Sequence, residues 1–152
     1  MEKFKNYAKA ILIPLLVEGI VGFIISDSID YTTLEKPFLS PPSILFPIMW
    51  TILYTLMGIS YGILKEKSLM DTECKKIYYM QLFVNAMWSI FFFTLKWRLF
   101  AFIWILLLDL LVIIMINCFY RKNRIAGLLQ IPYLLWSLFA SYLNLSIYIL
   151  NN

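Results

Sequence analysis

LFAFIWILLLDLLVIIMINCFY, residues 99–120, is an apolar run in which Asp109 is the one charged side chain. A spanning α-helix needs about 20 predominantly apolar residues to cross a hydrocarbon core of about 30 Å. In lipid, backbone amides and carbonyls find no water, and a helix satisfies them within one segment. The run also lacks the period-two alternation of a half-buried strand. Residues 99–120 therefore predict a transmembrane helix.

Four further apolar runs share this character and lie at residues 7–25, 44–64, 77–95 and 125–150. The chain is 62% hydrophobic and 14% charged, and its mean hydropathy is +0.79. Soluble domains carry about 25% charged residues, so this composition leaves too little polar surface to face water. We expect a single domain over residues 1–152, an all-α integral membrane protein built as a bundle of five transmembrane helices.

Basic residues are spread unevenly over the two ends of such a bundle. Ten of the 13 Lys and Arg residues lie in the N-terminal segment and in the loops after the second and fourth runs. The positive-inside rule then predicts the N-terminus inside and the C-terminus outside, with the long polar segment 26–43 also outside. Charges placed this way set topology and do not form the basic stripe that nucleic-acid binding requires. The short loops favour a bacterial cell membrane.

Two residue types limit the chemistry open to this chain. It contains no histidine, which excludes a Ser-His-Asp or Cys-His catalytic group, a histidine metal site and a haem with a proximal histidine. Cys74 and Cys118 have a spacing that gives neither a disulfide framework nor a zinc signature. We therefore expect no metal site.

Helical spacing gathers aromatic and polar side chains on one face of three of the runs. On residues 44–64 this face carries Phe46, Trp50, Tyr54, Met57 and Tyr61. On residues 77–95 it carries Gln81, Asn85, Trp88 and Phe92. On residues 125–150 it carries Tyr133, Trp136, Ala140 and Asn144.

These three faces have a functional and a structural interpretation. Indole, phenol and amide groups need hydrogen-bond partners in a dry environment, and turned inward they would line a cavity with flat apolar walls. Such a cavity suits a flat hydrophobic ligand with polar edges. The alternative is that the same residues serve as interfacial aromatic belts and as polar contacts between helices.

Two carboxylates and two glycines within the runs leave their roles open. Glu18 and Asp109 should face protein or water, because a charge at mid-bilayer costs about 2.5–3.5 kcal/mol even on a lenient scale. Each is either a site residue or a buried, hydrogen-bonded packing group. Gly58 and Gly62 form a small-xxx-small pair that indicates close helix contact, either within the bundle or in a homodimer.

Three segments resemble the TspO/MBR family, the translocator proteins, peripheral-type benzodiazepine receptors and tryptophan-rich sensory proteins. Residues 31–54, YTTLEKPFLSPPSILFPIMWTILY, resemble its Lys-Pro, Pro-Pro and Trp-Thr-x-Leu-Tyr pattern. Residues 81–92, QLFVNAMWSIFF, are similar to its Gln-Leu-x-x-Asn-x-x-Trp-Ser segment. Residues 132–144, PYLLWSLFASYLN, are similar to its Pro-Tyr-x-x-Trp-x-x-Phe-Ala-x-x-Leu-Asn segment.

The resemblance implies a function and a set of site residues. Family members bind porphyrins and drug-like ligands in a pocket within the five-helix bundle. This chain is then expected to be a membrane receptor or sensor for protoporphyrin IX, needing no cofactor and linked to tetrapyrrole metabolism or stress response. The implied ligand-binding residues are Tyr31, Phe46, Trp50, Asn85, Trp88, Trp136, Ala140 and Leu143.

Two other functions remain open under the same resemblance. Some family members degrade protoporphyrin in light, and the resemblance assigns that catalytic role to Trp50 and Trp136. A transporter of small hydrophobic molecules is the other alternative, although the sequence has no internal repeat of the kind that many transporters carry. The expected partners are a flat hydrophobic small molecule and membrane lipids, with no nucleic acid.

Overall fold

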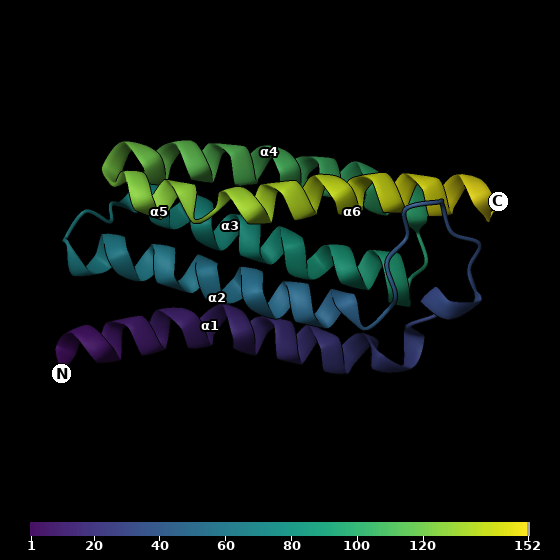
Figure 1. The fold of residues 1–152 in the computed structure, drawn as a ribbon, viewed down its shortest axis with the longest axis horizontal. Coiled ribbons are helices and arrows are strands. Elements are labelled where there is room, and N and C mark those ends of the chain that lie inside the picture. Colours follow the sequence, from purple (N-terminus) through teal and green to yellow (C-terminus); the bar gives the residue numbers. More distant parts are fainter. Residues whose placement is uncertain (152) are drawn as a thin grey trace.

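The computed structural model describes residues 1–151 as a bundle of helices joined by loops (Figure 1). Its α-helices are α1 (Glu2–Ile25), α2 (Leu45–Glu66), α3 (Thr72–Ser89), α4 (Arg98–Lys122), α5 (Arg124–Leu128) and α6 (Ile131–Leu150). Short 3-10 turns, η1 (Ser26–Ser28) and η2 (Tyr31–Thr33), lie in the α1–α2 loop, and a π-helical segment, η3 (Ile90–Thr94), continues α3. Within these residues, five helical segments are long and apolar enough to cross a membrane. The all-α class with five spans is confirmed.

The helices run up and down along one long axis, with the two termini at opposite ends (Figure 1). The outermost helix, α1, packs mainly on α2, while α4 packs on α3, α5 and α6. The buried core is therefore concentrated among α2, α3, α4 and α6. Large apolar side chains such as Leu12, Phe23 and Leu110 face outward, as expected for surfaces that meet acyl chains.

Local chemistry moves some helix ends away from the predicted boundaries. The third span begins at Thr72 rather than residue 77, because the Asp71 carboxylate accepts a hydrogen bond from the Cys74 backbone N–H at 2.8 Å and caps the helix. The fifth span is divided into α5 and α6. Pro132 stands in the first turn of α6, where its missing N–H costs little.

A disulfide joins Cys74 of α3 to Cys118 of α4, a pair that the spacing of the two cysteines did not predict. The two residues are 44 positions apart in sequence, and their Cα atoms are 5.8 Å apart. Spacing alone could not reveal the pair, since it depends on the start of α3 meeting the end of α4. Next to it, the Lys122 ammonium lies 2.7 Å from the Asp71 carboxylate. The hydrogen bond from the Cys74 N–H, and then the Lys122 ammonium, lower the pKa of Asp71.

Two glycines of α2 allow α1 to approach closely. A Cβ atom on Gly58 would lie 2.5 Å from the Ile11 Cα atom and 2.7 Å from the Ala10 carbonyl oxygen. A Cβ atom on Gly62 would lie 2.6 Å from the Tyr7 ring. The small-xxx-small pair therefore serves a contact inside the bundle. Because α1 has few other partners, this contact fixes its position.

We expect Gly58→Ala to lower the thermal stability of the protein in detergent. The new methyl group meets backbone atoms of α1, and overpacking of this kind costs about 1–3 kcal/mol. Gly19→Ala is the matched control, because a Cβ there meets nothing within 4 Å. Thermal unfolding should show a lower midpoint for Gly58→Ala and an unchanged or slightly higher one for Gly19→Ala. Equal midpoints would mean that α1 does not depend on this contact.

Candidate functional site

A cavity of about 350 Å³ lies between α1, α2, α3 and α6, next to the α1–α2 loop. This volume is at the lower end of the range typical of small-molecule sites. Aromatic side chains from α2 and α3 form much of its wall, and no Lys or Arg lies among its described lining residues. The cavity is therefore apolar with a few hydrogen-bonding groups.

The structure brings most of the predicted site residues to this one cavity. Seven of the eight line it, namely Tyr31, Phe46, Trp50, Asn85, Trp88, Ala140 and Leu143. Trp136 does not line it, but stands behind the wall in edge-to-face contact with Phe46 and Trp50, with ring centroids 5.8 Å and 6.4 Å apart. The indole N–H of Trp136 is buried and finds no hydrogen-bond partner among the described residues.

One wall of the cavity comes from α1, which the sequence motifs did not include. Its lining residues are Val17, Glu18, Val21, Gly22 and Ile25. They recur at helical spacing, but α1 is apolar on all sides, so periodicity gave no signal for an inward face. Glu18 was the exception, since a carboxylate inside a span had already indicated a site or a buried polar contact.

The Asn85 side chain is fixed by a hydrogen-bond chain that leads away from the cavity. Its amide nitrogen donates to the Tyr133 hydroxyl at 2.8 Å, and that hydroxyl donates to Gln81 Oε1 at 2.7 Å. The Gln81 amide nitrogen in turn donates to the Tyr78 carbonyl at 2.8 Å. A buried chain of satisfied groups holds each member in one orientation. Asn85 is thus presented to the cavity on a rigid support.

A second chain links the cavity wall to the loop end of the bundle. The Trp88 indole N–H donates to Asn144 Oδ1 at 2.9 Å, and the Asn144 amide nitrogen donates to the Arg98 carbonyl at 2.8 Å. The Arg98 guanidinium then reaches both oxygens of Asp30 in the α1–α2 loop, at 2.9 and 2.7 Å. Four segments distant in sequence are joined by these contacts.

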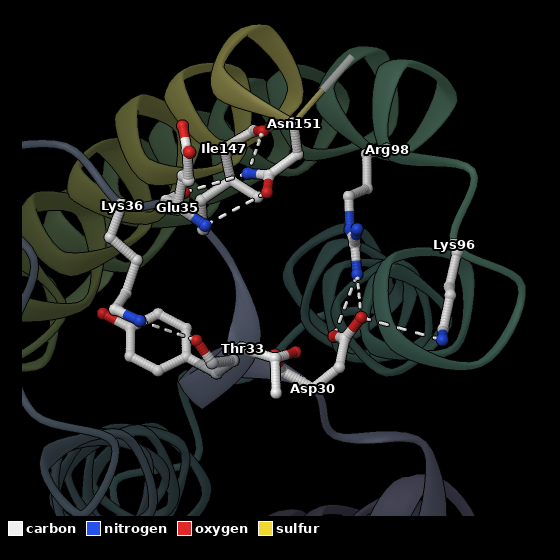
Figure 2. A network of polar contacts seen from close by, with 9 residues as sticks. Asp30, Thr33, Glu35, Lys36, Lys96, Arg98, Ile147 and Asn151 are labelled. Atoms are coloured by element: carbon white, nitrogen blue, oxygen red, sulfur yellow. Dashed lines mark hydrogen bonds and ion pairs between the residues drawn. The ribbon is translucent and has the colours of Figure 1, made fainter.

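The α1–α2 loop is held over this end of the bundle by two separate contacts (Figure 2). In the first, Arg98 and Lys96 both approach the Asp30 carboxylate, Lys96 at 3.7 Å. In the second, the Glu35 backbone N–H donates to Asn151 Oδ1 at 3.0 Å, and the Asn151 amide donates back to the Glu35 carbonyl at 2.9 Å. The loop is thus attached to the start of α4 and to the C-terminal end of α6.

Tyr31 connects the loop to the cavity. Its ring lies edge-on to Phe46, with centroids 5.0 Å apart, and its hydroxyl donates to the Pro41 carbonyl at 2.7 Å. Burial raises the pKa of the Tyr31 hydroxyl, which keeps it protonated as a donor. The Lys36 ammonium lies 4.9 Å from the centre of the Tyr31 ring and donates to the Tyr31 and Leu34 carbonyls. Tyr31 therefore closes the loop end of the cavity.

The π-helical segment η3 shapes the α3 wall. A π turn contains more residues than an α turn and shifts the faces that follow it. Here the adjacent residues Phe92 and Phe93 both line the cavity. Two residues after the segment ends, Lys96 has a positive φ of 57°, and the Trp97 N–H donates to the Phe91 carbonyl at 2.9 Å. This turn also directs Lys96 toward Asp30.

We expect Asp30→Asn to loosen the loop over the cavity. The substitution removes the charge that holds Arg98 and Lys96. Because the pair is partly exposed, we expect a loss of about 1 kcal/mol, or about fivefold faster amide exchange. Hydrogen exchange measured by mass spectrometry on residues 26–44 checks this, with Asp27→Asn as the control, since Asp27 is exposed and forms no ion pair among the described residues. Equal exchange in the two variants would remove Asp30 as an anchor of the loop.

Comparison with known proteins agrees with this architecture. Residues 10–150 match the model of the TspO/MBR family. A tryptophan-rich protein TspO of Archaeoglobus fulgidus is 41% identical over 93% of this chain and 95% of its own length. A tryptophan-rich protein TspO of Chlorobaculum tepidum is 38% identical over 80% of this chain and 78% of its own length. A translocator protein of Sus scrofa is 30% identical over 85% of this chain and 82% of its own length. The chain is an integral membrane protein that belongs to the TspO/MBR family.

Proposed function

We propose that this protein is a membrane receptor or sensor that binds protoporphyrin IX and other flat hydrophobic molecules in the cavity between α1, α2, α3 and α6. The observation that carries the proposal is the convergence of Trp50, Trp88 and Asn85 on one cavity from two different helices. Indole faces offer stacking surfaces for a planar ring, and a few amides orient it. A relative in Cereibacter sphaeroides is named a tryptophan-rich sensory protein, which supports a sensing role. We propose that this role is linked to tetrapyrrole metabolism or stress response.

The charges near the loop fit the acidic groups of a porphyrin. Protoporphyrin IX carries two carboxylates on one edge, and these need cationic or hydrogen-bonding partners. Arg98 and Lys96 are already paired with Asp30, whereas Lys36 forms no ion pair within residues 1–151 and instead donates to two carbonyl oxygens and lies over the Tyr31 ring. We propose that the ring enters the cavity with its carboxylates toward Lys36, at the end closed by Tyr31.

The orientation in the membrane is part of the same proposal. The N-terminus and the α2–α3 loop lie at one end of the bundle, and the α1–α2 loop lies at the other (Figure 1). The end with the N-terminus carries ten of the 13 basic residues. We propose that this end is inside, in a bacterial cell membrane, and that the cavity lies near the outer face.

We expect Ala140→Leu to reduce binding of protoporphyrin IX by about tenfold or more, because the larger side chain fills space that a ligand would occupy. Quenching of tryptophan fluorescence by added protoporphyrin measures the affinity. The control is Gly19→Leu, which adds a side chain of the same size to an open face of α1. Equal affinity in Ala140→Leu and the wild type would place the porphyrin site elsewhere.

Light-dependent breakdown of bound porphyrin is a second candidate function. It is favoured by the pairing of Trp50, which lines the cavity, with Trp136 behind it, at an interplanar angle of 88°. In this scheme the excited porphyrin takes an electron from the Trp50 indole and passes it to dioxygen, which leaves a neutral porphyrin, superoxide and an oxidised Trp50 that exchanges electrons with Trp136. The neutral porphyrin then returns one electron to the oxidised tryptophan pair, and the resulting porphyrin radical cation combines with superoxide. The net reaction adds dioxygen to the porphyrin and leaves both indoles reduced.

We expect Trp50→Phe to slow the loss of porphyrin absorbance in light and air more strongly than Trp136→Phe, since only Trp50 borders the cavity. Rates are normalised to the amount of bound porphyrin, so that a binding defect is not counted as a chemical one. Trp97→Phe serves as the control, because Trp97 is exposed and lies outside the cavity. Bleaching that is equally fast in all three variants would exclude a role for these indoles.

A further inference from the structure

Glu18 is the only acidic side chain among the described residues that line the cavity. It is half-buried in α1, and it lies on the same helical face as Gly22 and Ile25, four and seven residues further on, which also line the cavity. No Lys or Arg borders the cavity within residues 1–151. The cavity wall therefore offers a ligand one acidic group, and the nearby Lys36 ammonium lies beyond the lining residues, over the Tyr31 ring.

The depth of Glu18 follows from the contact between α1 and α2. Gly62 faces Tyr7, and Gly58 faces Ala10 and Ile11, so the two helices run antiparallel with a fixed register. This register brings Glu18 to the level of Trp50, about one and a half turns into α2. The carboxylate thus lies inside the span, well below the Lys36 end of the cavity.

Glu18 has no hydrogen bond or ion pair to any other residue between 1 and 151. Asp109, the other carboxylate within a span, behaves differently. It accepts hydrogen bonds from the hydroxyls of Ser137 and Ser141, the latter at 2.6 Å, and it does not line the cavity. The bundle itself supplies the hydrogen-bond donors that Asp109 needs. The carboxylate oxygens of Glu18 have no donor among the described residues and can accept hydrogen bonds from a ligand.

An unpaired carboxylate in an apolar cavity favours a particular partner. A protonated nitrogen forms a charge-assisted hydrogen bond with it, and the low dielectric strengthens this attraction. The surrounding aromatic rings, including Trp50, Tyr54 and Phe92, offer π faces that also attract a cation. A flat aromatic body with one protonated nitrogen matches both features of the cavity.

We propose that Glu18 determines ligand specificity and that the cavity selects flat, hydrophobic ligands that carry a protonated nitrogen at the Glu18 end. This inference rests on the proposed binding function of the cavity, and it adds the chemical class of ligand that binds there. It distinguishes two ends of the site. The end near Lys36 accepts anionic groups, and the Glu18 end accepts cationic ones.

The test compares two probes of nearly the same shape in a nonionic detergent. 9-Aminoacridine is a planar cation at neutral pH, and 9-methylanthracene is a neutral hydrocarbon. Saturable quenching of tryptophan fluorescence gives the affinity of each. We expect Glu18→Gln to weaken the binding of 9-aminoacridine by about tenfold and to change the affinity for 9-methylanthracene by less than about twofold. We expect Glu18→Asp to retain part of the preference for the cation over the neutral hydrocarbon. Asp27→Asn removes the same charge outside the cavity and should change neither affinity.

The outcomes separate this inference from the proposed function. If 9-aminoacridine binds Glu18→Gln as tightly as the wild type, or if Asp27→Asn weakens it equally, the role of Glu18 is overturned. If protoporphyrin IX fails to quench the wild type while the cation binds in a Glu18-dependent way, the porphyrin proposal fails and the specificity of the cavity stands. Glu18→Gln removes no hydrogen bond or ion pair within the described residues and keeps the size of the side chain, so it should fold like the wild type.

Discussion

The pairing of buried polar side chains between α3 and α6 is the contact on which this cavity depends. In a bilayer an unpaired indole N–H or amide is costly, because no water is present to form a hydrogen bond with it, and partners within the bundle remove that cost. Trp88 with Asn144, and Asn85 with Tyr133, supply them at 2.9 and 2.8 Å. Because these bonds have direction, they hold the two helices at a set distance and keep the cavity walls in place.

The same polar groups connect the interior to the loop. Asn144 accepts from Trp88 and donates to the carbonyl of Arg98, whose guanidinium holds Asp30. A movement of Trp88 in the cavity wall would therefore displace Asn144 and Arg98, and through them the loop. Conversely, release of Asp30 would leave the Arg98 guanidinium without its carboxylate partner. Such a chain is a physical connection through which occupancy of the cavity and position of the loop can be coupled, provided that a ligand contacts the two arrangements differently.

Most of the fold, and part of the site, could be predicted from the sequence. Apolar runs gave five spans, because a bilayer demands long helices and little else. Helical periodicity placed the faces of α2, α3 and α6 correctly, since each carries polar groups that contrast with lipid-facing residues. Periodicity did not identify the inward face of α1, because the residues on that face, Val17, Val21 and Ile25, are as apolar as those that face lipid. The Cys74–Cys118 pair was also hidden, since it depends on tertiary geometry.

Glu18 and Asp109 show why composition alone cannot assign a role to a charge in the membrane. Both stand in apolar spans, where a charged group is costly to remove from water. Asp109 faces a helix that offers two serine hydroxyls one turn apart, so the bundle itself satisfies it. Glu18 faces a cavity instead, and no residue between 1 and 151 gives it a hydrogen bond or an ion pair. The difference lies in the partner helix, and only the packed structure reveals which carboxylate has been left for a ligand.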